Sequence, residues 1–177
     1  MIIMLNGSFG VGKTTVACIL RRMFAGSMIY DPEPVGLALR RLSTWVGLKG
    51  GGTDDFQDIE LWRRSVIAGT RTVRAIARGL VIVPMTFCRR NYFDEVVGGL
   101  KRFDTVRVFC LRAEIVTILE RLDKRGTADG EYLWLYPKAG ECVEAHRDPH
   151  FGEPINTEGI SAAEVARDIA RRLELRE

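Results

Sequence analysis

A phosphate-binding loop is indicated near the start of the chain by the segment Gly7-Ser8-Phe9-Gly10-Val11-Gly12-Lys13-Thr14, which fits the pattern G-x-x-x-x-G-K-[ST]. Glycines let a backbone turn back on itself and aim successive N–H groups at one anion. In this pattern the lysine reaches the outer phosphates of a nucleoside triphosphate, and the hydroxyl that follows it ligates Mg²⁺. We therefore expect ATP and Mg²⁺ to bind here, with Lys13 as a catalytic residue and Thr14 as a metal ligand.

The residues on either side of this loop favour the same interpretation. The run Ile2-Ile3-Met4-Leu5 is typical of a buried strand, and beyond Thr15 apolar residues recur at helical spacing, at Val16, Ile19, Leu20 and Met23. A helix that begins at the loop adds its partial positive charge where the N–H groups converge. The sequence thus predicts nucleotide contacts along the whole segment 7–15.

A carboxylate, Asp31, is expected beside the loop. It follows the apolar residues 28–30, which predict a second strand, and the carboxyl ends of parallel strands meet at one edge of a sheet. There Asp31 could accept a proton from a substrate hydroxyl or hold a water molecule on Mg²⁺. The alternative is that Asp31 caps a helix that opens at Pro32, because Asp is also a favourable N-cap residue.

Two arginines, Arg121 and Arg125, lie four residues apart on one face of the helix predicted over 114–125. Beyond them the glycine-broken segment 126–140 resembles a lid, and we expect this mobile lid at approximately 123–145. Phosphoryl transfer requires charge on the transferred group to be neutralised, so arginines in a lid suit that chemistry. In the alternative, both side chains lie on a solvated helix face.

A second pocket is expected after the glycine-rich segment 47–53. Phe56 and Trp62 could stack on a ring, and Arg63 or Arg40 could bind an anionic or polar group. In the competing interpretation the two aromatic side chains belong to the core and Arg63 lies on the surface. Periodicity does not decide between them.

The elements that must position these residues alternate along the chain. Apolar runs predict strands at 2–5, 28–30, 80–83, 105–111 and 154–156. Helical patterns predict helices at 16–23, 35–46, 55–78, 91–100, 114–125 and 161–173, with a break at 126–130 and a mixed segment after it up to about 149. Asp54 or Asp55 is expected to cap the long helix that reaches about residue 78, and a capping box of Ser161 and Glu164 opens the last helix. The alternation specifies a single α/β domain over 1–177, with a five-stranded parallel sheet, helices on both faces and a ligand crevice at the carboxyl ends of the strands.

Composition narrows the function classes. The 177 residues are 46% hydrophobic and 28% charged, as in soluble globular proteins, and no apolar run is long enough for an integral membrane segment. The chain begins directly with the first predicted strand, without room for a signal peptide, so the cytoplasm is the expected location. The net charge of +3, without a basic run that alternates with aromatic residues, does not favour nucleic acid as a partner.

One departure from the usual pattern concerns the metal. The strand predicted at 80–83 ends in Pro84-Met85-Thr86, where many proteins with this loop carry an Asp that orients Mg²⁺. Metal support would then come from Thr14, phosphate oxygens and water, with Asp31 acting through a water molecule. The sequence also lacks the Asn-Lys-x-Asp motif that reads guanine, so use of ATP in the manner of a kinase is favoured over a GTPase.

Ordered sequence blocks resemble the tunicamycin resistance proteins, a family of small ATP-binding proteins with this loop. Besides the loop, the blocks are Tyr30-Asp31-Pro32-Glu33, Gly36-Leu37-Ala38-Leu39-Arg40, Asp55-Phe56-Gln57, Leu61-Trp62-Arg63, Leu80-Val81-Ile82-Val83-Pro84-Met85-Thr86, Tyr92-Phe93-Asp94-Glu95 and Arg121-Leu122. The resemblance implies the three-layer P-loop fold of nucleotide and shikimate kinases. It also implies a role in resistance to tunicamycin, a nucleoside antibiotic that mimics a sugar nucleotide.

By analogy with small-molecule kinases of that fold, roles can be assigned to individual residues. Asp31 would activate a hydroxyl of the drug, Lys13 and Arg125 would stabilise the transferred phosphoryl group, and Arg121 would contact the base or the phosphates. The acceptor pocket would be lined by Asp31, Arg40, Phe56, Trp62, Arg63 and Thr86.

An ATP-dependent phosphotransferase acting on tunicamycin or a related nucleoside-like compound is the first hypothesis. Two alternatives stay open: an ATP-loaded protein that sequesters the drug without modifying it, and a metabolite or nucleoside kinase on the same scaffold. The sequence does not indicate the oligomeric state.

Overall fold

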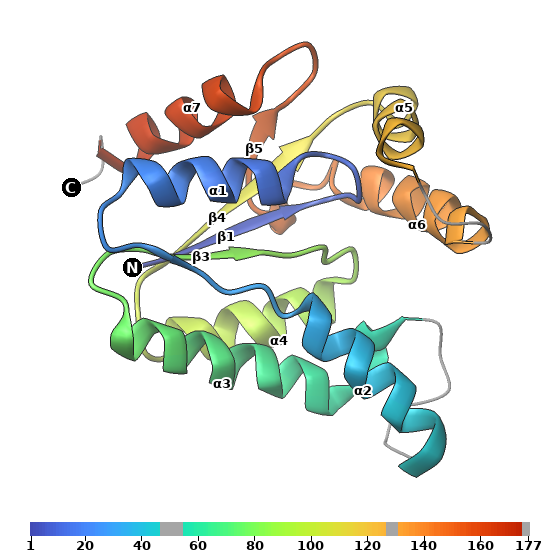
Figure 1. Ribbon diagram of the computed structural model, residues 1–177, viewed down its shortest axis with the longest axis horizontal. Coiled ribbons are helices and arrows are strands. Elements are labelled where there is room, and N and C mark those ends of the chain that lie inside the picture. The colour runs from blue at the N-terminus through green and yellow to red at the C-terminus, as the bar shows by residue number, and fades with distance from the viewer. Residues whose placement is uncertain (47–54, 127–130, 175–177) are drawn as a thin grey trace.

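Five strands form one parallel sheet in the computed structural model, which describes residues 1–46, 55–126 and 131–174 (Figure 1). The strands are β1 (Ile2–Gly7), β2 (Met28–Ile29), β3 (Val81–Pro84), β4 (Val106–Arg112) and β5 (Glu153–Asn156), in the order β2-β3-β1-β4-β5. Each neighbouring pair runs parallel. The predicted sheet is therefore confirmed, whereas the glycine-rich segment 47–53 lies outside the described residues.

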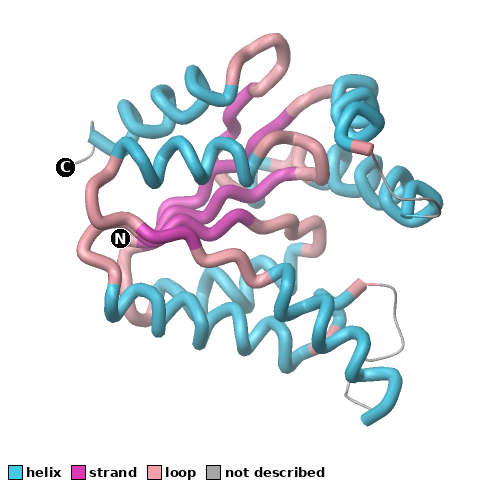
Figure 2. The backbone as a smooth tube through the Cα atoms, in the orientation of Figure 1, coloured by secondary structure: helices cyan, strands magenta, loops and turns pink. Residues whose placement is uncertain are grey.

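Helices cover both faces of this sheet. α1 (Lys13–Met23) and α7 (Ala162–Glu174) lie on one face, and α3 (Glu60–Ile76) and α4 (Arg90–Lys101) lie on the other (Figure 1). The end to which the strands point carries α2 (Glu33–Val46), α5 (Ile115–Arg125), α6 (Glu131–Ala145) and the short 3₁₀ helices η1 (Phe56–Asp58) and η2 (Pro149–Phe151). Figure 2 shows the strands as a central layer between two helical layers, which confirms the three-layer α/β arrangement.

The central strand β1 is buried along its whole length, because helices cover the sheet on both sides. Its side chains alternate between the two faces. Ile3 and Leu5 pack in the core cluster beneath α1 and α7, and Ile2 and Met4 pack in the cluster beneath α3 and α4. Each of these fully buried side chains contributes about 1.5–3 kcal/mol relative to an exposed one. The strand that carries the loop is thus anchored from both sides.

The strand order reverses at β1, which has β3 on one side and β4 on the other. In doubly wound sheets the ligand crevice opens beyond the carboxyl end of such a strand. Asn6 holds the neighbouring segments together there: its Nδ2 donates to the carbonyl oxygen of Phe87 at 3.2 Å, and its Oδ1 accepts the N–H of Phe87 at 2.8 Å. The chain after β3 is thereby fixed beside the start of the loop.

Helix α6 occupies most of the segment that was expected to be mixed, which follows the break at 126–130 and extends to about 149. Pro137 lies inside this helix, and proline disfavours a helix interior, so local propensity argues against it. Tertiary contacts stabilise it instead: Ala139 is buried, and Trp134 packs against Phe9 with ring centroids 5.6 Å apart. The expectation was wrong because packing outweighs intrinsic propensity.

Two helix starts were predicted from capping residues, with different outcomes. Asp55 caps η1, its Oδ1 accepting the N–H of Gln57 at 3.0 Å, so α3 begins later than expected, at Glu60. The capping box before α7 is confirmed. The N–H of Ser161 donates to Oε2 of Glu164 at 3.0 Å, and the N–H of Glu164 donates to Oγ of Ser161 at 3.3 Å.

Candidate functional site

The phosphate-binding loop connects β1 to α1. Gly10 and Gly12 have φ angles of 73° and 102°, a region that favours glycine. Gly12 is the N-cap of α1, so the unpaired N–H groups and the positive end of the helix meet at one point. At Gly7 a Cβ would approach the carbonyl oxygen of Leu111 to 2.8 Å, so the close contact with β4 also requires glycine. This geometry suits an anion with several negative charges.

Lys13 is buried at the start of α1. Its Nζ donates hydrogen bonds to the carbonyl oxygens of Gly7 at 2.9 Å and Ser8 at 2.8 Å. Burial lowers the pKa of Lys13, and the carboxylates of Glu33 and Asp31 are among the groups that oppose this change. Phosphate oxygens at the loop would restore the interactions that this ammonium loses on leaving water. Thr14 and Thr15 are exposed beside it.

Asp31 lies at the end of β2, where the sequence predicted a carboxylate. Its side chain is exposed, and Oδ1 accepts the N–H of Glu33 at 3.0 Å, which caps the first turn of α2. The capping role that the sequence left open is therefore present in the fold. The negative charge of Asp31 also acts on Lys13, where it opposes the lowering of the pKa by burial.

Glu33 is a second carboxylate at this edge, and the sequence analysis gave it no role. It is partly buried, and burial raises the pKa of its carboxyl group. Lys13 and Arg125 lower the same pKa, and Asp31 raises it, so all three charges act on this carboxyl group. The signal in the sequence was its position, two residues after Asp31 at the mouth of the predicted crevice.

A cavity of about 400 Å³, here called the aromatic cavity, opens between the loop, α2, η1 and α6. Its lining residues are Phe9, Glu33, Leu37, Arg40, Phe56, Trp134 and Leu135. Arg40 and Phe56 were predicted for the second pocket and both line this cavity. Trp134 was missed, because it lies on α6, where the sequence showed no usable periodicity. Aromatic side chains from three separate elements suit a planar ring.

Trp62 and Arg63 were predicted for the second pocket, but neither is among the residues that line this cavity. Trp62 is fully buried, donates from Nε1 to the carbonyl oxygen of Pro32 at 3.1 Å, and packs edge-on against Phe56 with centroids 4.9 Å apart. It therefore holds the start of α2 and the ring of Phe56 in position.

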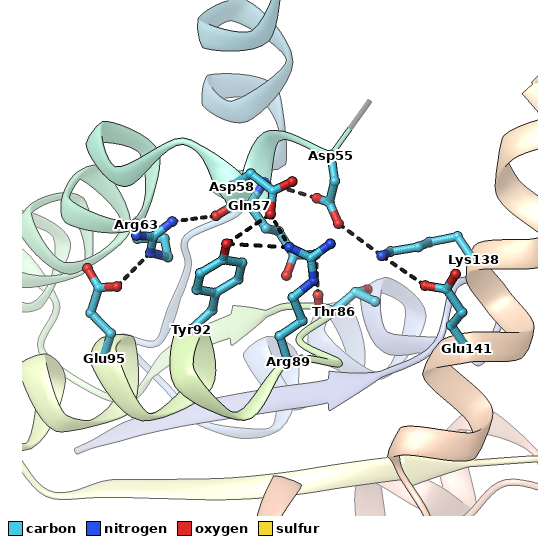
Figure 3. Close-up of polar contacts among 10 residues, drawn as sticks. All are labelled: Asp55, Gln57, Asp58, Arg63, Thr86, Arg89, Tyr92, Glu95, Lys138 and Glu141. Carbon is cyan, nitrogen blue, oxygen red and sulfur yellow. Dashed lines mark hydrogen bonds and ion pairs between the residues drawn. The ribbon is translucent and has the colours of Figure 1, made fainter. Parts of the chain in front are cut away.

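The guanidinium of Arg63 is buried rather than at the surface. Its Nε donates to Oε2 of Glu95 at 2.6 Å, its Nη1 donates to the carbonyl oxygen of Gln57 at 2.7 Å, and it lies 4.2 Å from the centre of the Tyr92 ring (Figure 3). These contacts tie η1 to α4, and neither earlier interpretation of Arg63 anticipated them.

Thr86 follows β3 and is buried. Its carbonyl oxygen accepts a hydrogen bond from Nε2 of Gln57 at 2.6 Å (Figure 3). Its Oγ1 has no hydrogen-bond partner among the residues that the structure describes. The carbonyl group of Thr86 thus holds Gln57 of η1 in place, whereas its hydroxyl group makes no hydrogen bond to a described residue.

A buried ion pair links α6 to the N-cap of η1 (Figure 3). Nζ of Lys138 lies 3.2 Å from Oδ2 of Asp55 and 3.1 Å from Oε2 of Glu141. Ser8 adds a second link, since its Oγ donates to the carbonyl oxygen of Ala139 at 3.0 Å. Helix α6 is therefore held both to the loop and to the residue that caps η1.

A smaller cavity of about 230 Å³ lies on the other side of the loop, beside Arg121. It is lined by Val11, Gly12, Thr15, Val16, Arg121, Thr157, Ile160, Ala162 and Val165. The guanidinium of Arg121 is oriented by Thr157: Nη2 donates to the carbonyl oxygen at 2.8 Å and Nη1 to Oγ1 at 3.1 Å. A flat guanidinium opposite apolar walls forms a slot for a ring.

Arg125 is exposed at the end of α5, with residues 127–130 of the expected lid outside the described chain. Its charge reaches Glu33 and lowers the pKa of that carboxyl group. Arg125 and Lys13 therefore act on the same carboxylate from different elements. Arg121 and Arg125 were predicted on one helix face. Arg121 lines the smaller cavity, whereas the charge of Arg125 acts on Glu33, which lines the aromatic cavity.

A third cavity, of about 350 Å³, lies between the ends of β4 and β5, α5 and α6 and contains Arg112 and His146. His146 is buried, and its Nε2 donates to the carbonyl oxygen of Phe87 at 2.8 Å. Its Nδ1 has no partner among the described residues. Burial lowers the pKa of His146 to about 4, so the ring is neutral near neutral pH.

Comparison with known proteins gives the family context. No family model matches the chain, and no curated protein sequence matches it. Among solved structures, the tunicamycin resistance protein of Deinococcus radiodurans is 27% identical, with a TM-score of 0.77, over 98% of this chain and 95% of the other. The resemblance predicted from the sequence blocks is confirmed by this match.

Two kinases illustrate the wider fold. A gluconokinase from Sinorhizobium meliloti is 16% identical, with a TM-score of 0.65, over 99% of this chain and 96% of the other. Shikimate kinase from Acinetobacter baumannii, solved with shikimate, is 17% identical, with a TM-score of 0.58, over 99% of this chain and 94% of the other. These matches confirm the P-loop kinase fold. No helix in the described part of the chain is long and apolar enough to cross a membrane.

Proposed function

We propose that this protein is an ATP-dependent phosphotransferase that acts on a hydroxyl of tunicamycin or a related nucleoside-like compound. One observation carries the proposal: the aromatic cavity has Phe9 of the phosphate-binding loop in its wall and Glu33, beside Lys13, at its side. A ring compound held there would present a hydroxyl next to the terminal phosphate of a nucleotide on the loop. Proximity of this kind is the main requirement of phosphoryl transfer.

The nucleotide part of the proposal assigns ATP to the loop and to the slot beside Arg121. The N–H groups of 7–15 and the ammonium of Lys13 would bind the phosphates, and the adenine ring would lie against Arg121. The observations in support are the positive φ angles of Gly10 and Gly12, the burial of Lys13 and the apolar walls of the slot. In transfer, Lys13 and Arg125 would neutralise charge on the moving phosphoryl group.

The donors at the loop fit Mg²⁺ bound mainly through phosphate and water. Within the described residues, no group of three or more His, Cys, Asp or Glu side chains could hold a metal ion by itself. Mg²⁺ characteristically keeps several waters and takes one or two protein ligands. We assign the exposed Thr14 hydroxyl as the direct ligand and Asp31 as a ligand through water. When bound, the metal would offset the negative charge of the phosphates.

The acceptor would lie in the aromatic cavity. Phe9, Phe56 and Trp134 would contact its ring, and Arg40 would bind a polar or anionic group at the edge. Trp62 would support this wall through Phe56, and Arg63 and Thr86 would hold η1 through their bonds to Gln57. One of the two carboxylates at the end of β2, Asp31 in the sequence prediction, would accept the hydroxyl proton. The segment 123–145 of this one domain would act as the lid, through α6.

A binding protein without catalysis is the second candidate. The end of β3 favours it, because Pro84-Met85-Thr86 has no Asp to orient Mg²⁺. In that case ATP and the drug would both bind, and neither would be changed. A kinase for a common metabolite is the third candidate, favoured by the likeness in fold to a gluconokinase and a shikimate kinase.

Mass spectrometry of the drug tests the proposal. Purified protein is incubated with Mg·ATP and tunicamycin, and the expected product is tunicamycin with one added phosphoryl group and an equal amount of ADP. Tight binding of both ligands with unmodified drug would overturn the phosphotransferase and support the binding protein. A panel of sugars, nucleosides and shikimate in the same assay identifies a metabolite kinase, if one of them is turned over in preference to tunicamycin.

A further inference from the structure

The two carboxylates at the end of β2 differ in what their oxygens contact. Asp31 is exposed, and its Oδ1 already accepts the N–H of Glu33 as a helix cap. The carboxylate of Glu33 receives no hydrogen bond or ion pair from any residue that the structure describes, although it is partly buried. Glu33 lines the aromatic cavity, whereas Asp31 is not among the residues that line it.

Charges from separate elements act on Glu33. Lys13 lies at the start of α1, Arg125 at the end of α5 and Asp31 in the turn before α2. Arg40, about two turns further along α2, lines the same cavity. Lys13 and Arg125 are the cations proposed for the transferred phosphoryl group. Glu33 therefore shares the cavity with the ring-binding side chains and is coupled to both cations, as expected of a group near the attacking oxygen.

We propose that Glu33, rather than Asp31, accepts the proton of the acceptor hydroxyl. The inference rests on the proposed function. In the step, the hydroxyl proton passes to a carboxylate oxygen of Glu33 while the acceptor oxygen forms a bond to the γ-phosphorus. The bond from the γ-phosphorus to the bridging oxygen breaks, and ADP leaves with that electron pair. Asp31 then keeps the first turn of α2, and with it Glu33, in position.

The test compares Glu33→Gln with Asp31→Asn, using Mg·ATP and tunicamycin. Glutamine preserves shape and removes the basic oxygen, so kcat for Glu33→Gln is expected to fall roughly 100-fold or more, with little change in the KM for ATP. Asp31→Asn is expected to lose less kcat than Glu33→Gln. Glu33→Asp should recover part of the rate. Glu120→Gln, an exposed glutamate of α5 outside the cavities described above, is the matched control and should match the wild type.

A pH profile separates a base from a merely structural residue. Wild-type kcat should rise with pH through an acid limb, and the residual rate of Glu33→Gln should lack that limb. If Glu33→Gln keeps wild-type kcat, or if Asp31→Asn is the more damaged variant and loses the limb, the assignment to Glu33 fails while the phosphotransferase stands. If the wild type transfers no phosphate to any acceptor, both proposals fail.

Discussion

Lys13, for which we propose a role in phosphoryl transfer, is held in the fold at a cost to stability. Its ammonium is buried, its pKa is lowered by that burial, and two backbone carbonyl groups are its hydrogen-bond partners. Replacement by a neutral side chain of similar length removes the desolvation cost together with the contact to phosphate. Replacement of Lys13 should therefore lower the rate of phosphoryl transfer without lowering the stability of the fold.

We predict that Lys13→Met lowers phosphoryl transfer roughly 100- to 1000-fold without lowering the melting temperature. The matched control is Lys101→Met, an exposed lysine of α4, which should retain full activity. Calorimetry measures the melting temperature, and the release of ADP measures the rate of phosphoryl transfer. Wild-type turnover in Lys13→Met would contradict the assignment of the loop.

His146 sets a pH dependence of folding. An unfolded histidine titrates near 6.5, whereas burial lowers the pKa of His146 to about 4 in the folded protein. Between these values the unfolded chain binds the proton and the folded chain does not. The stability present above pH 6.5 should therefore be lost as pH falls towards 4, by about 3 kcal/mol in total.

Urea unfolding at pH 7.5 and pH 4.5 checks this expectation. His146→Gln should show a smaller decrease in the free energy of unfolding between the two pH values than the wild type. The exposed His150→Gln should keep the wild-type decrease. Equal pH dependence in wild type and His146→Gln would show that other groups cause the effect.

At the scale of elements, α6 is the helix whose position decides the shape of the site. It contributes Trp134 to the aromatic cavity and Lys138 to the buried pair with Asp55. Both side chains of that pair are only 10% exposed. Removal of one partner leaves a charge with little solvent, which is more destabilising than loss of a surface pair.

We predict that Lys138→Met lowers the free energy of unfolding by about 3 kcal/mol and weakens acceptor binding. The control is Arg147→Met, which removes an exposed pair with Glu144 on the same helix and should cost less than about 1 kcal/mol. The double variant Lys138→Met with Asp55→Asn should recover part of the loss. Denaturant titrations measure all three, and equal effects of Lys138→Met and Arg147→Met would contradict the role of the buried pair.

At the scale of the whole molecule, a ligand that binds the folded protein should raise its free energy of unfolding. The loop joins β1 at the centre of the sheet to α1, so nucleotide contacts act on the core of the protein. A ligand that binds only the folded state stabilises it by RT ln(1 + [L]/Kd).

Mg·ATP at 100 times its Kd should raise the free energy of unfolding by about 2.7 kcal/mol, and Lys13→Met should abolish most of the increase. Tunicamycin should add a further rise in the melting temperature when ATP or an inert analogue is present. Thermal shift measurements with each ligand alone and together check both statements. A melting temperature that does not respond to ATP would exclude nucleotide binding at the loop.

The sequence by itself determined the parts whose chemistry is local. The residues from Gly7 to Thr14 could be identified because backbone turns, a helix start and a lysine must follow one another within eight positions. The strands could be identified because burial on both faces requires continuous apolar runs. The capping box before α7 is local in the same way, since both of its residues lie in one turn of helix.

Only the tertiary structure decided which side chains form the second pocket. Phe9, Glu33, Phe56 and Trp134 come from elements spread over more than a hundred residues, and no periodicity relates their directions. The same is true of α6, which local propensity disfavours and packing against Phe9 stabilises. A phosphate-binding loop is a property of neighbouring residues, whereas an acceptor cavity is a property of how distant elements pack.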